Sequence, residues 1–205
     1  KVMTHDDLAS GRDFGRYLDV DGDGIPYRTY PGVHPGRGSY FTRGTTRDAY
    51  ARYTEEGGPY IENMERLLRK FETAKSVAPG PLIQLAARPT KLGIVHYGST
   101  APAMDEAAAQ LAKQGVDIDV LRVRAFPFSD EIVDFINAHD RVFVVEQNRD
   151  AQLRTLLMAE HGLDPQKLVA VLHYDGTPIT ARFITRAIAD LVGAAQETGK
   201  EKAPA

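Results

Sequence analysis

From residue 91 onward, short apolar stretches alternate with segments of helical periodicity. The apolar stretches predict strands over 91–97, 116–123, 142–145 and 168–172. Helical spacing predicts helices after Thr100, after Ser129, around Leu153–Leu157 and around Ile184–Ile188. Strands that alternate with helices form βαβ units. We therefore predict an α/β domain over 90–195, a three-layer αβα open and mostly parallel sheet.

The residues before this domain follow a different pattern. Residues 1–59 are dense in Gly and Pro and carry interleaved aromatics such as Tyr30, Tyr40 and Phe41. Disordered tails are poor in aromatics, so we expect an extended ordered arm that lies against something larger. Residues 60–89 are expected to form one helix, then a linker with three prolines, and residues 196–205 a flexible tail. The helix carries one apolar stripe, formed by Ile61, Met64, Leu67, Leu68 and Phe71.

Composition narrows the function classes. With 25 basic and 28 acidic residues the net charge is −3, so no nucleic-acid partner is expected. No apolar run reaches the ~20 residues that span a bilayer, and no apolar leader is seen; we expect no membrane partner and a cytoplasmic protein. The chain has no cysteine, which excludes disulfides, thiolate zinc sites and an iron–sulfur cluster held by its own thiolates. It begins with Lys1, which indicates either a tag remnant before Met3 or the carboxyl portion of a longer protein.

Two turns carry candidate chemistry. Gly98, Ser99 and Thr100 follow the first predicted strand, and Glu146, Gln147 and Asn148 follow the third. The carboxyl ends of parallel strands face the crevice where such folds bind ligands. Hydroxyls and backbone N–H groups would suit an anion or carboxylate, and Glu146 could accept hydrogen bonds or move a proton. The alternative is that Thr100 and residues 146–148 only cap the helices that follow.

Other motifs are weaker. Asp19, Asp21 and Asp23 precede Gly24 as in the first half of a calcium loop, but the twelfth position is Tyr30 instead of a bidentate Glu. We interpret this segment as a turn, with a weak metal site as the alternative. The 6 histidines show no ligand spacing, and His96 is expected to be a satisfied core histidine. Neither a nucleophile elbow nor a phosphate loop is present, so no catalytic residue is assigned.

Several longer segments together resemble a known family. They are RYLDVDGDGIPYRTYPGVHP (16–35), YFTRGTTRDAYARYTEE (40–56), NMERLLRKFETA (63–74), IVHYGST (94–100), VLRVRAFPF (120–128) and VFVVEQNRDAQL (142–153). They resemble the alpha subunit of bacterial 2-oxoglutarate:ferredoxin oxidoreductases, within the 2-oxoacid:acceptor oxidoreductase superfamily. The chain departs from the family at Ala151, often Gly there, and at Thr45-Thr46-Arg47, where a Gly-His pair is common.

The resemblance implies a transketolase C-terminal-like domain in the carboxyl segment of an alpha subunit. The assembled enzyme would use thiamine diphosphate, Mg²⁺ and an iron–sulfur cluster to convert 2-oxoglutarate and CoA to succinyl-CoA and CO₂ while reducing ferredoxin. This segment would bind none of these cofactors alone. Its partners would be the upstream domains, the beta subunit and, through the complex, ferredoxin and CoA.

In the complete enzyme, this segment would take part in subunit assembly and would help to complete a CoA or substrate site at the two turns. The alternative is an independent α/β module that binds a small anion or another subunit and has no catalysis of its own.

Overall fold

The structure is a computed structural model, which describes the backbone of residues 1–201 and the side chains of residues 1–194. The chain divides into two compact units, Lys1–Ala78 and Pro79–Ala205.

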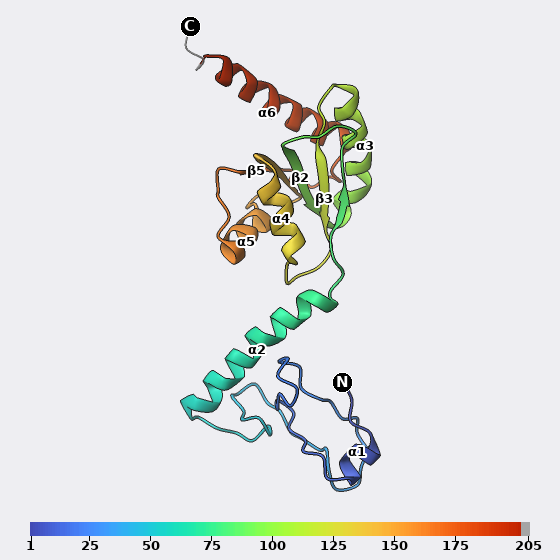
Figure 1. Cartoon of the computed structure of the whole chain (residues 1–205), viewed down its shortest axis with the longest axis vertical. Helices are drawn as coiled ribbons and strands as arrows, with labels where there is room; N and C mark the ends of the chain where they lie inside the picture. The colour runs from blue at the N-terminus through green and yellow to red at the C-terminus, as the bar shows by residue number, and fades with distance from the viewer. Residues whose placement is uncertain (202–205) are drawn as a thin grey trace. The chain divides into compact units, whose positions relative to one another are not determined.

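The first unit consists of an irregular arm and one long helix, as predicted (Figure 1). A short helix that the sequence did not predict, α1 (His5–Ala9), begins at a capping box formed by Thr4 and Asp7. Met3 and Leu8 are the buried anchors of this end of the arm. The long helix α2 (Gly57–Val77) is the helix predicted after residue 60.

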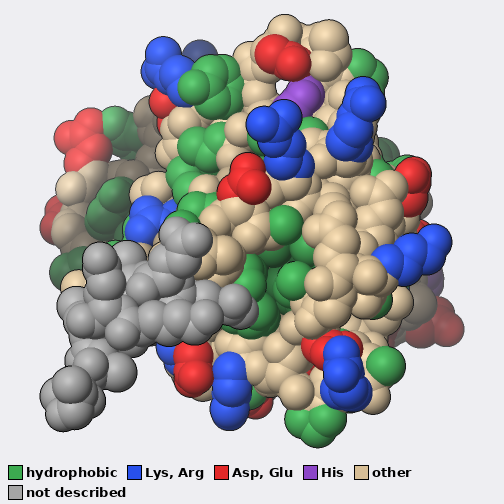
Figure 2. Space-filling model, turned by 90° about the horizontal axis from the view of Figure 1, so that it is seen from above, with side chains coloured by type: hydrophobic (Ala, Val, Ile, Leu, Met, Phe, Trp, Pro, Cys, Tyr) green, Lys and Arg blue, Asp and Glu red, His purple; other side chains and the backbone are tan. Residues whose placement is uncertain are grey.

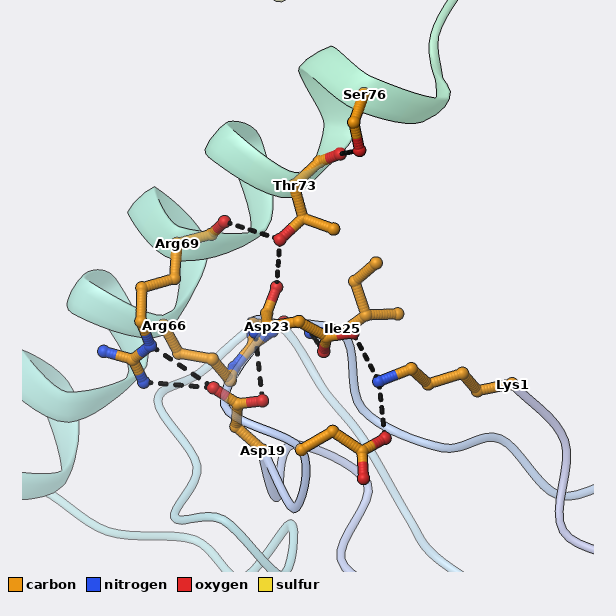
Figure 3. A network of polar contacts seen from close by, with 10 residues as sticks. Lys1, Asp19, Asp23, Ile25, Arg66, Arg69, Thr73 and Ser76 are labelled. Carbon is orange, nitrogen blue, oxygen red and sulfur yellow. Dashed lines mark hydrogen bonds and ion pairs between the residues drawn. The ribbon is translucent and has the colours of Figure 1, made fainter.

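The side of α2 that meets the arm is polar. Arg66 donates from Nη1 to the carbonyl of Gly24 at 2.9 Å, and Thr73 donates to the carbonyl of Asp23 at 2.6 Å (Figure 3). Arg69 pairs with Asp19 at 3.3 Å. A Cβ at Gly24 would lie 2.3 Å from the backbone nitrogen of Lys70, so only glycine lets the arm approach α2 this closely.

The predicted apolar stripe of α2 therefore does not hold the arm. Ile61, Met64 and Leu68 are exposed by 57%, 37% and 68%. The helix is amphipathic in the usual sense, but the arm is bound through hydrogen bonds while the apolar side faces outward from this unit.

The second unit is built on a five-stranded sheet with the order β1-β3-β2-β4-β5. The parallel strands are β2 (Leu92–Tyr97), β3 (Asp119–Val123), β4 (Arg141–Glu146) and β5 (Leu168–Leu172). The sequence missed the edge strand β1 (Leu82–Gln84), which pairs antiparallel with β3 inside the predicted linker. Three residues next to Pro79 and Pro81 give no periodicity, and prolines are tolerated at a sheet edge.

Helices cover both faces of this sheet (Figure 1). The helices α3 (Ala101–Lys113) and α6 (Ala181–Glu201) pack over one core, which contains Ile94, Met104 and Phe143. The helices α4 (Asp130–Ala138) and α5 (Gln152–His161) pack over the other, which contains Val95 and Val144. Adjacent residues of one strand enter opposite cores because side chains alternate across a sheet. The three-layer αβα fold is confirmed.

The predicted tail over 196–205 remains a prediction, because its side chains and residues 202–205 lie outside the described residues. Within the described part of the chain, no helix is long and apolar enough to cross a bilayer. On the face drawn in Figure 2 the basic and acidic side chains are interspersed.

Candidate functional site

The sheet brings the two predicted turns together. β2 and β4 are neighbours, with His96 paired to Val145, so their carboxyl ends meet at one edge. Gln147 donates from Nε2 to the hydroxyl of Ser99 at 3.0 Å and to the hydroxyl of Thr100 at 3.2 Å. The juxtaposition inferred from parallel topology is therefore present. Whether a ligand meets these turns is a separate question, and that role remains a prediction.

The carboxylate of Glu146 is hydrogen-bonded to groups of the protein itself. Its side chain is fully buried, with 0% exposure. The carboxylate accepts hydrogen bonds from the backbone N–H of Leu153 at 2.7 Å, from the N–H of Arg154 at 3.0 Å and from Asn148 Nδ2 at 2.7 Å. A carboxylate at the first N–H groups of a helix also meets the positive end of its dipole. Glu146 is thus the cap of α5, which favours the capping interpretation at this turn.

Asn148 completes the same turn. Its Oδ1 accepts from the N–H groups of Asp150 at 3.1 Å and Gln152 at 3.2 Å. The residue just before α5, Ala151, has φ of 49°, in the left-handed region. Glycine is preferred in that conformation, so the departure from Gly noted in the sequence introduces backbone strain beside Asn148.

The capping interpretation is wrong for Thr100. Its side chain makes no capping bond to α3, and its backbone is already helical. The short 3₁₀ turn Gly98–Thr100 leads directly into α3. The buried Thr100 hydroxyl accepts a hydrogen bond from Gln147 instead. Gly98 has φ of 60°, and a Cβ there would meet nothing within 4 Å. The exposed Ser99 and the open backbone of Gly98 are the accessible groups of the site.

The aspartate cluster of the first unit is satisfied without a metal. Lys1 Nζ lies 2.7 Å from the carboxylate of Asp21 and 2.6 Å from that of Asp23. Hydrogen bonding to Lys1 lowers the pKa of both carboxyls below the ordinary value. Asp19 accepts from the N–H of Gly24 at 3.0 Å and pairs with Arg69. Figure 3 shows Lys1 and Arg69 reaching this turn from different segments.

Possible metal ligands do not gather into a site in the described part of the chain. No group of three His, Asp or Glu side chains suited to a metal ion occurs among the described residues, and cysteine is absent from the sequence. The residues present therefore do not fit an iron–sulfur cluster. We assign this chain no cofactor-holding residue.

Two of the buried histidines in the sheet region, His96 and His139, differ in their hydrogen-bond partners. His139 is satisfied: Nδ1 lies 2.6 Å from the carbonyl of Phe135 and Nε2 lies 3.1 Å from the carboxylate of Asp119. His96 is only 3% exposed, yet its Nδ1 has no hydrogen-bond partner within the described residues. Burial, and then the charge of Arg122, lower the pKa of His96 from 6.5 to about 4, while Asp105 opposes the shift. The prediction that His96 is a satisfied core histidine was right about burial and wrong about satisfaction.

The class of fold follows from comparison with solved structures. The structure of 2-oxoglutarate:ferredoxin oxidoreductase from Magnetococcus marinus, with 2-oxoglutarate, coenzyme A and succinyl-CoA bound, has a TM-score of 0.76. The match covers 88% of this chain and 31% of that chain at 18% identity, which shows a shared fold. A split-gene transketolase has a TM-score of 0.41 over 53% of this chain and 40% of that chain, at 22% identity.

A particular relative is similar in sequence. The alpha subunit of 2-oxoacid:ferredoxin oxidoreductase 2 from Aeropyrum pernix is 26% identical over 194 residues. The match covers 93% of this chain but only 28% of the relative. No family model matches the chain. The resemblance to an alpha subunit of the 2-oxoacid:ferredoxin oxidoreductases is thereby confirmed.

Proposed function

We propose that this chain is the carboxyl-terminal segment of the alpha subunit of a thiamine-diphosphate-dependent 2-oxoacid:ferredoxin oxidoreductase. The assembled enzyme would convert 2-oxoglutarate, CoA and oxidised ferredoxin to succinyl-CoA, CO₂ and reduced ferredoxin. The observation that carries the proposal is the similarity to an alpha subunit over 93% of the chain, which includes both the arm and the α/β unit. A relative that shared only the α/β fold would support a much wider range of functions.

The role of this segment in that enzyme is assembly. Ile61 and Leu68 stay exposed on α2, and the arm exposes Tyr30 by 67% and Phe41 by 69%. Burying one large apolar side chain contributes roughly 1.5–3 kcal/mol, and aromatic anchors are typical of interface centres. The partner surfaces we propose are the upstream domains of the alpha subunit and the beta subunit.

A second part of the proposal concerns the turns at 98–100 and 146–148. The solved oxidoreductase contains coenzyme A, and in this chain Ser99 is exposed at the carboxyl end of β2. We propose that Gly98 and Ser99 contribute to a CoA or substrate site completed by other domains. Thr100, Glu146, Gln147 and Asn148 would hold that turn in place through the hydrogen bonds described above.

Reconstitution tests the assembly role. The chain is co-expressed with the upstream alpha-subunit domains and the beta subunit, and ferredoxin reduction dependent on 2-oxoglutarate and CoA is measured. Leu68→Asp should abolish co-purification and activity because it places a charge on the exposed apolar side of α2. Leu68→Met is the matched control and should retain both. An active complex that lacks this chain, or full assembly by Leu68→Asp, would contradict the proposal.

The second candidate function is an independent small-anion or subunit-interaction module. The exposed Ser99 and the open Gly98 favour it, because they need no other domain to be accessible. Isothermal titration of the 205-residue chain with CoA, 2-oxoglutarate and phosphate distinguishes it from the first. Binding that is lost in Ser99→Val, without any requirement for the other subunits, would favour the independent module. Absence of heat with all three compounds would count against it.

A further inference from the structure

A depression of about 210 Å³ lies on the second unit, and its lining includes none of residues 98–100 and 146–148. Its floor includes strand residues of β1, β2 and β3, and its wall includes the first turns of α3. The polar side chains that line it are Gln84, His96, Asp105 and Arg122. These four residues come from four different elements, so no sequence motif groups them.

The sheet register places two of these side chains next to each other. Arg122 of β3 is the direct partner of His96 on β2 and of Leu82 on β1. Paired residues of neighbouring strands point to the same face, and the strands lie roughly 4.8 Å apart. Two residues earlier, the paired Ile94 and Val120 belong to the core under α3. His96 and Arg122 therefore project to the α3 side as well.

Both groups lack a protein partner. The ring of His96 is more than nine-tenths buried, and its Nδ1 is unpaired within the described residues. Arg122 is partly buried, and its guanidinium forms no hydrogen bond or ion pair in the described part of the chain. Buried polar groups are almost always hydrogen-bonded. The imidazole ring of His96, with its unpaired Nδ1, and the partly exposed guanidinium of Arg122 border the same depression, where an anionic ligand would contact both side chains.

The charges of the lining restrict the class of that ligand. The Arg122 guanidinium presents a planar fork that matches a carboxylate. Because the pKa of His96 is about 4, its ring is neutral near neutral pH and offers one N–H donor, not a second positive charge. Asp105 adds a negative charge to the wall, so the lining holds one cation and one anion. A singly charged carboxylate fits this balance better than a doubly charged phosphate.

We propose that this depression binds the carboxylate group of a small organic acid, held by the Arg122 guanidinium and the ring N–H of His96. Binding at this depression would require only this chain. Its lining includes none of the residues of the turns at 98–100 and 146–148.

The test is a titration of the ¹⁵N-labelled 205-residue chain with acetate and, separately, with inorganic phosphate, followed by NMR of the histidine ring. Acetate should shift the His96 resonances in a saturable way. It should also raise the pKa of His96 because a bound negative charge favours the imidazolium. The charged groups that face this ring from the packed elements are Asp105 of α3 and Arg122 of β3.

Two variants separate a ligand contact from a general charge effect. Arg122→Gln should weaken acetate binding roughly tenfold or more, the cost of losing a charge-assisted hydrogen bond. Arg124→Gln removes the same charge two residues along, at an exposed position outside the lining, and should bind like the unsubstituted chain. The thermal unfolding of both variants shows whether they are folded.

Three results would overturn the proposal. One is a His96 resonance that does not respond to acetate. Another is equal weakening by the two arginine substitutions, which would mean that only net charge matters. The third is phosphate binding more tightly than acetate, which would refute the carboxylate assignment.

Discussion

The unsatisfied state of His96 predicts an acid sensitivity that can be isolated from the rest of the protein. In the folded chain the pKa of this ring is lowered from 6.5 to about 4, first by burial and then by Arg122. Above pH 6.5 the ring is neutral in both the folded and unfolded states and contributes no pH dependence. As the pH falls from 6.5 towards 4, the His96 ring binds a proton in the unfolded chain but stays neutral in the folded chain. The folded state therefore loses stability relative to the unfolded state.

The size of this loss of stability follows from the difference between the pKa of His96 in the unfolded chain and in the folded chain. The fall from 6.5 to about 4, at about 1.4 kcal/mol per pH unit, gives a loss of about 3 kcal/mol. This is a large part of the stability of a typical domain. Below pH 4 the folded ring is protonated as well, and the loss should level off.

The assay compares the unsubstituted chain with His96→Asn. Urea unfolding is followed by far-ultraviolet circular dichroism, since the chain has no tryptophan, at several pH values between 4 and 7. Asparagine does not titrate, so the difference between the two free energies of unfolding should change by about 3 kcal/mol across this range, in the direction that disfavours the histidine at low pH. The other histidines and the carboxylates titrate in both proteins and cancel. Parallel curves for the two proteins would refute the reasoning.

Three further perturbations test other parts of the structure. Glu146→Gln should destabilise the second unit by about 2–3 kcal/mol, because the amide replaces one acceptor that serves the N–H groups of α5; urea unfolding checks this against exposed Asp150→Asn, which should change little. Gly24→Ala should release the arm to limited proteolysis because its Cβ would overlap α2, whereas Gly22→Ala, with the similar φ of 74° but nothing within 4 Å, should cost only about 1–2 kcal/mol of backbone strain. Ala151→Gly should raise the unfolding free energy by about 1 kcal/mol by relieving φ of 49°, and a lower melting temperature would contradict that account.

The sequence determined the architecture of the second unit. Apolar strands such as 142–145 and the helices between them have only one efficient packing, a parallel sheet covered on both faces. That topology also sufficed to place Ser99 near Gln147, because it fixes which strand ends meet at the sheet edge. The resemblance to an alpha subunit rested on residues distributed over both units, and comparison confirmed it.

Tertiary structure decided what local patterns leave open. Thr100 is a residue type that often caps helices, yet its hydroxyl accepts a hydrogen bond from Gln147. It does not cap α3 because its backbone is already helical where the 3₁₀ turn continues into α3. The apolar stripe of α2 indicates burial, yet the arm binds the opposite side. There Arg66 donates to the carbonyl of Gly24, Thr73 donates to the carbonyl of Asp23, and Gly24 approaches the helix backbone.

Which buried polar groups find hydrogen-bond partners could not be predicted from the sequence. His96 and His139 are both buried, and the sequence does not distinguish them. Within the described residues, the ring of His139 lies beside the carbonyl of Phe135 and the carboxylate of Asp119, whereas Nδ1 of His96 has no partner. The edge strand β1, invisible as three residues among prolines, brings Leu82 beside Arg122 and so forms one side of the depression. The contact between His139 and Asp119 joins two segments that lie apart in the sequence, and such contacts exist only once the sheet register is set.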